Sequence, residues 1–118
     1  MNILIKRAYE KPSPDDGLRI LVDRLWPRGL SREEAKIDVW LKGVAPSNDL
    51  RHWYQHDVQK WPEFKMRYFA ELDNHVDAVN ELLSYVDKGD VAFLFAAKEA
   101  QYNNAVALKE YLNLVVSR

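Results

Sequence analysis

An unbroken apolar run at residues 91–97 limits the folds open to this chain more than any other segment does. A strand that is apolar at every position must be covered on both faces, which is typical of a parallel sheet. Shorter apolar segments at residues 3–5 and 18–22 predict two further strands, and residues 37–44 are a weaker candidate. Apolar residues at helical spacing predict helices between residues 62 and 86, with a break near residues 73–74. We therefore predict an α/β fold, a three-layer sandwich in which helices flank a small, mainly parallel sheet.

The direction of the first strand is left open by the sequence. The segment that follows it contains two prolines and Asp15-Asp16-Gly17, which favour a loop rather than a helix. Parallel crossovers generally need about a dozen residues or more, and this segment is shorter. Antiparallel pairing would place Lys6 and Arg7 at the opposite end of the sheet from the residues that follow the second strand.

Composition excludes several classes of protein. The chain has 118 residues, a formal net charge of −1 and no cysteine, and 47% of its residues are hydrophobic. Its length predicts one domain over residues 1–118. The near-zero charge favours neither nucleic acid nor an anionic membrane, and the absence of cysteine excludes disulfides and thiolate chemistry. No apolar run is long enough for a signal peptide or a membrane span, so we expect a cytoplasmic protein.

Ionisable residues follow each of the three clearest predicted strands. They are Lys6-Arg7, Asp23-Arg24 and Lys98-Glu99. Ligands of open parallel α/β sheets bind outside the carboxyl ends of the strands. A helix that begins near Asn103 would point its N-terminus, which favours anions, at the same place. Because arginine matches a carboxylate or a phosphate with two parallel hydrogen bonds, we predict a small anionic ligand.

The segment around Trp26 supplies most of the candidate site residues. Arg24 and Arg28 would clamp the anion, and Asp23 would orient them. If the protein is an enzyme, which the sequence leaves open, Asp23 or Glu99 is the candidate catalytic proton acceptor. The predicted ligand-binding residues are Arg7, Arg24, Trp26, Arg28, Lys98 and Asn104. The alternative is a structural role, in which Asp23 pairs with Arg24 or Arg28.

Two further interpretations concern the middle of the chain. His52 and His56 stand at helical spacing and could ligate a metal, although surface histidines explain them more simply, and we predict no metal and no cofactor. Aromatic residues between positions 53 and 69 alternate with basic ones, so an interaction module for protein or nucleic acid is the alternative function. Helical spacing also explains them as a core face, and burial of Trp53, Tyr54 and Trp61 would speak against the interaction module. The oligomeric state is left open.

Several motifs along the chain form a recognisable set. They are Lys6-Arg7-Ala8-Tyr9, Ser13-Pro14-Asp15-Asp16-Gly17, Val22-Asp23-Arg24-Leu25-Trp26-Pro27-Arg28-Gly29, Ala45-Pro46-Ser47, His56-Asp57, Glu71-Leu72, Ala96-Ala97-Lys98 and Asn104-Ala105. This set resembles the YeaO-like proteins, a domain-of-unknown-function family of small bacterial and archaeal proteins. The resemblance implies an α/β fold.

The resemblance also implies a polar site after the second and last strands. Its members here would be Asp23, Arg24, Lys98, Glu99 and Asn104. Glu99 stands where the family pattern has Asp or Asn. The cysteines of the wider family are absent, so thiol chemistry proposed for it cannot operate in this chain.

Overall fold

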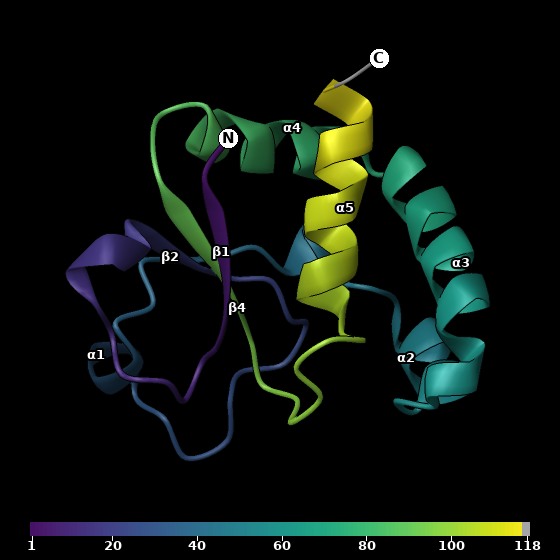
Figure 1. Ribbon diagram of the computed structural model, residues 1–118, viewed down its shortest axis with the longest axis horizontal. Coiled ribbons are helices and arrows are strands. Elements are labelled where there is room, and N and C mark those ends of the chain that lie inside the picture. The colour runs from purple at the N-terminus through teal and green to yellow at the C-terminus, as the bar shows by residue number, and fades with distance from the viewer. Residues whose placement is uncertain (117–118) are drawn as a thin grey trace.

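The fold is built on a four-stranded sheet with the strand order β1-β4-β2-β3, in which every neighbouring pair runs parallel. The strands are β1 (Ile3–Arg7), β2 (Leu18–Leu21), β3 (Val39–Trp40) and β4 (Val91–Phe95). The computed structural model describes residues 1–116, and the last two residues of the predicted domain, 117 and 118, lie outside the described part. Figure 1 shows the sheet with helices around it, and the predicted α/β fold is confirmed.

β4 lies between β1 and β2 in the sheet, and all of its residues are buried, as its apolar run predicts. Its side chains alternate between two cores. Val91, Phe93 and Phe95 belong to the larger core, whereas Ala92 and Leu94 belong to the smaller core on the other face. The alternation follows from the two-residue period of a strand, and it requires cover on both faces.

Helices supply that cover unequally. The larger core receives side chains from α2 (Asn48–Tyr54), α3 (Trp61–Asp73), α4 (Val76–Val86) and α5 (Asn104–Val116). The smaller core is covered by α1 (Arg32–Ala35) and by loop residues. In Figure 1, α1 accordingly lies on one side of the sheet, away from α3 and α5. The predicted three layers are present, and the third is thin.

Several predicted boundaries differ slightly from those observed. The break between α3 and α4 falls at residues 74–75, one residue beyond the predicted 73–74. β4 ends at Phe95 rather than at residue 97, and only Val39–Trp40 of residues 37–44 pair as a strand. The chain leaves the sheet there because a 3-10 turn, η2 (Lys42–Val44), buries Val44 instead of continuing the strand.

The first strand runs parallel to β4, and therefore also to β2. The segment that joins β1 to β2 contains one 3-10 turn, η1 (Pro14–Asp16), and no α-helix. The carboxylate of Asp16 is buried and binds Lys6 Nζ on β1 at 2.9 Å and Arg19 Nη1 on β2 at 2.6 Å. One carboxylate thus fastens this short crossover to both strands. Because the strands are parallel, β1 and β2 end at the same edge of the sheet.

Candidate functional site

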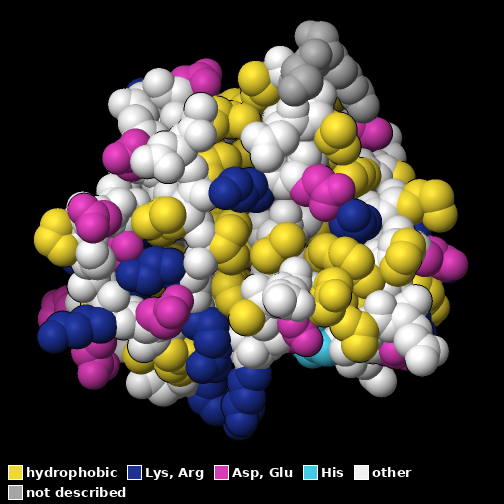
Figure 2. All heavy atoms as spheres, viewed as in Figure 1, with side chains coloured by type: hydrophobic (Ala, Val, Ile, Leu, Met, Phe, Trp, Pro, Cys, Tyr) yellow, Lys and Arg dark blue, Asp and Glu magenta, His cyan; other side chains and the backbone are white. Residues whose placement is uncertain are grey.

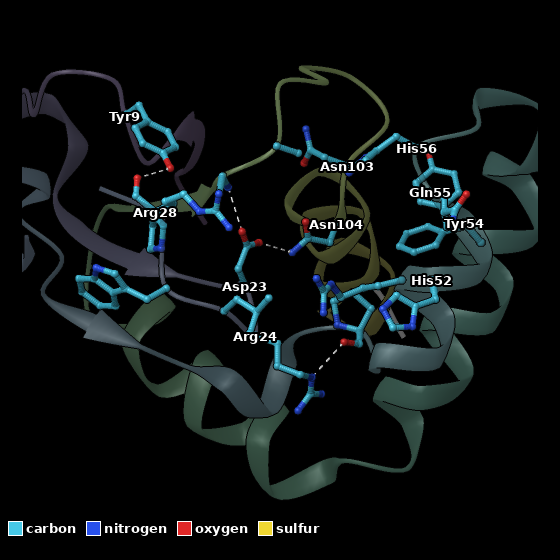
Figure 3. A pocket seen from close by; sticks show the side chains of 18 residues that line it. Tyr9, Asp23, Arg24, Arg28, His52, Tyr54, Gln55, His56, Asn103 and Asn104 are labelled. Atoms are coloured by element: carbon cyan, nitrogen blue, oxygen red, sulfur yellow. Dashed lines mark hydrogen bonds between the residues drawn. The ribbon is translucent and has the colours of Figure 1, made fainter. Parts of the chain in front are cut away.

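A cavity of about 630 Å³ opens where β2 and β4 end and α5 begins. Side chains from residues 23–28 line one side of it, and side chains from α2 and the turn after α2 line the other. Figure 3 shows Asp23 and Asn104 between these two walls. On the outside of the molecule, Lys and Arg side chains gather below the carboxyl end of β4 (Figure 2).

The carboxylate of Asp23 lies in the cavity and is held by two neighbouring elements. Its Oδ1 accepts a hydrogen bond from Asn104 Nδ2 at 3.0 Å, and its Oδ2 accepts one from the N–H of Ala96 at 2.9 Å. Burial raises the pKa of Asp23; the two hydrogen bonds and the nearby charges of Arg51 and His56 oppose this shift without cancelling it. Asp23 forms no ion pair with any residue in 1–116, so the alternative of a closed pair with Arg24 or Arg28 is wrong.

Three arginines line the cavity, and none of them is bound to Asp23. Arg24 donates from Nε and Nη2 to the carbonyls of Pro46 and Ala45, both at 3.3 Å. Arg51 donates to the side chain of Asn48. The guanidinium of Arg28 is exposed and forms no hydrogen bond or ion pair within the described part of the chain. The backbone carbonyl of Arg28 accepts a hydrogen bond from the hydroxyl of Tyr9 at 2.8 Å.

Trp26 fixes the backbone of the segment that carries these groups. Its Nε1 donates to the carbonyl of Leu30 at 2.7 Å, and its ring meets the ring of Trp40 edge-on at 5.2 Å. Trp40 in turn donates to the carbonyl of Asp23 at 2.8 Å. Trp26 also lines the cavity, and the two indoles together hold the loop against the end of the sheet.

The wall opposite Asp23 belongs to α2. Ser47 caps this helix, and its N–H and hydroxyl both donate to the carboxylate of Glu71 on α3, at 2.9 and 2.6 Å. The helix ends at Tyr54 and is followed by Gln55 and His56, whose φ values of 46° and 57° are left-handed. This turn brings His56 back to the cavity, where its ring lies 5.9 Å from that of Tyr54 (Figure 3).

The aromatic part of the cavity is formed by Tyr54 and Phe64, whose rings stack at 4.3 Å. The hydroxyl of Tyr54 donates to the carbonyl of Tyr102 at 2.7 Å, and burial, with the nearby charge of Glu99, raises the pKa of Tyr54 to about 12. The Tyr54 hydroxyl therefore stays neutral at physiological pH.

The sequence of this chain matches a known protein family over nearly its whole length. The chain matches, over residues 2–118, a family described as "Inactive DUF488-N3 subclade". The chain belongs to this family. It is 38% identical to the uncharacterised protein YeaO of Escherichia coli (strain K12), over 95% of this chain and 97% of that protein. It is 37% identical to an uncharacterised protein of Mycobacterium tuberculosis (strain ATCC 25618 / H37Rv), over 94% and 93% of the two chains. The predicted resemblance to YeaO-like proteins is confirmed, and no solved structure gives a match.

The site residues that the family resemblance implies separate into two groups. Asp23, Arg24 and Asn104 line the cavity, whereas Lys98 and Glu99 lie outside its lining. The Glu99 carboxylate instead accepts the N–H groups of Gln101 and Tyr102, at 2.9 and 3.2 Å, and so orders the loop before α5. Lys98 is exposed.

Arg7, predicted from its place after the first strand, also lies outside the cavity lining. Its guanidinium donates to the carbonyls of Ala96 and Ala97, at 3.0 and 2.9 Å. These two alanines line the cavity themselves, so Arg7 shapes the cavity through the backbone that follows β4.

Sequence reasoning missed the contribution of α2 to the site. Arg51, His52 and His56 line the cavity. Both histidines are exposed, which agrees with their interpretation as surface residues, but the sequence did not assign them to the site. Within residues 1–116, no three His, Cys, Asp or Glu side chains meet in a way that could hold a metal ion. The signal that could have found this wall was present, because the family motifs include Ala45-Pro46-Ser47, Glu71 and His56.

The aromatic residues of the middle helices mostly serve packing. Tyr54 is buried, and Trp53 and Trp61 are half-buried against the larger core. The ring of Trp53 is further covered by the guanidinium of Arg67, at 4.3 Å from its centroid.

No helix in residues 1–116 is long and apolar enough to cross a membrane.

Proposed function

We propose that this protein binds a small anionic molecule, phosphorylated or carboxylated, in the cavity at the carboxyl ends of β2 and β4. The observation that carries the proposal is the charge of the lining, which contains three arginines, Arg24, Arg28 and Arg51, and a single carboxylate, Asp23. Guanidinium groups bind phosphates and carboxylates through paired, charge-assisted hydrogen bonds. A cytoplasmic location, as expected from the sequence, agrees with such a ligand.

The N-terminus of α5 adds to this preference for an anion. The helix begins at Asn104, whose side chain lines the cavity. Asn103 caps it, since its Oδ1 accepts the N–H of Val106 at 3.0 Å. The positive end of the helix dipole therefore lies beside the arginines and favours negative charge.

Binding without catalysis is the form of the proposal that we favour. Of the two predicted catalytic proton acceptors, Glu99 lies outside the cavity lining and its carboxylate accepts backbone N–H groups. The description of the family as inactive supports the same choice. A binding domain needs an ordered cavity and charges that suit its ligand, and the arginine-lined cavity supports this form of the proposal.

The test is the affinity for inorganic phosphate, measured by isothermal titration calorimetry. We expect Arg28→Ala to weaken binding about tenfold, the effect of losing about 1.4 kcal/mol of binding free energy. Its melting temperature should not change, because the guanidinium of Arg28 supports no other residue in 1–116. Arg24→Ala tests the proposal less specifically, since it also removes the hydrogen bonds that Arg24 donates to the carbonyls of Ala45 and Pro46.

Lys88→Ala is the matched control. Lys88 is exposed and precedes β4, so its substitution by alanine removes one positive charge at the opposite end of the sheet. An equal loss of affinity in Lys88→Ala and Arg28→Ala would mean that phosphate responds only to net charge, and the proposal would be wrong. Absence of phosphate binding by the unmodified protein would also contradict it.

A further inference from the structure

Two aspartates in this protein have opposite electrostatic environments. Asp16 is buried with two cations on its carboxylate, Lys6 at 2.9 Å and Arg19 at 2.6 Å. Asp23 is partly buried, and it has no cation on its carboxylate although three arginines line the same cavity. A carboxylate taken out of water is normally paired, so the missing cation at Asp23 needs an explanation.

Two of the three arginines, Arg24 and Arg51, do not reach Asp23 because their neighbours hold them elsewhere, and Arg28 forms no ion pair with it. Arg24 is turned to the carbonyls of Ala45 and Pro46, and Arg51 is bound to Asn48. Asp23 is equally fixed, by Ala96 on one oxygen and Asn104 on the other. Each carboxylate oxygen can accept a further hydrogen bond, and the side chain lines the cavity.

We infer that the ligand is a zwitterion, an anion that also carries an ammonium group, with Asp23 binding the ammonium while the arginines bind the anionic end. This inference rests on the proposed function and narrows its ligand class. It also removes an electrostatic conflict, because a simple anion placed beside ionised Asp23 would be repelled by it. The raised pKa of Asp23 agrees with a carboxylate that lacks its cation in the unliganded protein.

The fixed geometry of Asp23 makes it suited to selecting ligands. Its two hydrogen bonds come from different elements, Ala96 after β4 and Asn104 at the start of α5. The carboxylate is therefore positioned before the ligand arrives, and little ordering is left to be done on binding. A ligand that has the anion but not the ammonium gains nothing from this arrangement.

The experiment compares two ligands that share a phosphate and an ethyl chain, O-phosphoethanolamine and ethyl phosphate. Dissociation constants are measured at pH 8, where both phosphates are dianions and the amine is protonated. We expect the unmodified protein to bind O-phosphoethanolamine about tenfold or more tightly than ethyl phosphate. In Asp23→Asn the two affinities should agree within about twofold, whereas Arg28→Ala should weaken both alike and preserve their ratio.

Each outcome bears on one of the two proposals. Equal affinities in the unmodified protein would overturn the zwitterion while leaving anion binding intact, and they require no variant to fold. A preference that survives in Asp23→Asn would show that another group recognises the ammonium, so the assignment of Asp23 would be wrong. If neither compound nor inorganic phosphate binds, the proposed function itself fails.

Discussion

At the scale of single residues, the difference between Asp16 and Asp23 could be predicted only in part. The sequence places Asp23 after a buried strand, and this position predicted a residue of the cavity. Asp16 lies in a stretch that the sequence marks only as a turn. Its role depends on Lys6 and Arg19, which reach it because both strands present these side chains to the same face of the sheet. Pairing across strands of unknown order cannot be read from local sequence.

Asp16→Asn should lower the free energy of unfolding by about 3 kcal/mol, because it leaves the buried guanidinium of Arg19 without its counter-charge. Burial alone would raise the pKa of Asp16, but hydrogen bonds from Lys6, Ser13 and Arg19 hold it below its usual value. The unfolded chain therefore takes up the proton first, and this stability is present above about pH 3.9 and lost as the pH falls further. Urea unfolding at pH 7 and at pH 3 measures both effects.

Asp15→Asn is the control for that experiment. Asp15 adjoins Asp16 but is exposed, and its carboxylate forms no hydrogen bond or ion pair within residues 1–116. Its variant should unfold like the original protein at both pH values. A similar loss in the two variants would mean that charge in the turn matters, rather than the buried pair.

At the scale of elements, the sequence predicted most helices and strands but not how α2 meets the sheet. Periodicity and capping residues are local, so α3, α4, α5 and β4 were predicted close to their observed bounds. The position of α2 depends on contacts between Ser47 and Glu71, which are far apart in the sequence. The short β3 was overestimated because an imperfect alternation of apolar residues does not distinguish a strand from a buried turn.

The end of α2 allows a prediction about stability. Gln55 has a φ of 46°, a left-handed conformation that suits glycine and costs other residues free energy. Gln55→Gly should therefore raise the free energy of unfolding by about 0.5–1 kcal/mol. Thermal unfolding measures the change. Lys36→Gly provides a comparison, because Lys36 ends α1 with a φ of 49° and lies outside the cavity lining.

The comparison separates backbone conformation from a contact of the glutamine side chain. Both glycine variants should be more stable than the original protein by similar amounts. If Gln55→Gly lowers stability while Lys36→Gly raises it, the Gln55 side chain supports the cavity wall by contacts, and the conformational account of this turn is wrong.

At the scale of the whole molecule, the sequence predicted a parallel α/β sheet but neither its strand order nor the direction of β1. The order β1-β4-β2-β3 arises because the most apolar strand takes a central position. The outer edge of β1 is partly closed by side chains, since Lys109 donates to the carbonyl of Ile3 and Glu10 accepts the N–H of Arg7. Such cover protects an edge strand from pairing with another chain. The parallel arrangement brings β2, β4 and α5 together at one cavity.

The central claim is that this cavity is where an anion binds. The most direct measurement is an NMR titration of the isotopically labelled protein with inorganic phosphate, followed at every backbone amide. The account predicts saturable shifts concentrated at the amides of Arg24, Arg28, Ala96 and Asn104, which line the cavity, with little change at Lys88 beyond the opposite end of β4. Shifts that do not saturate, or that cluster away from the carboxyl ends of the strands, would contradict it.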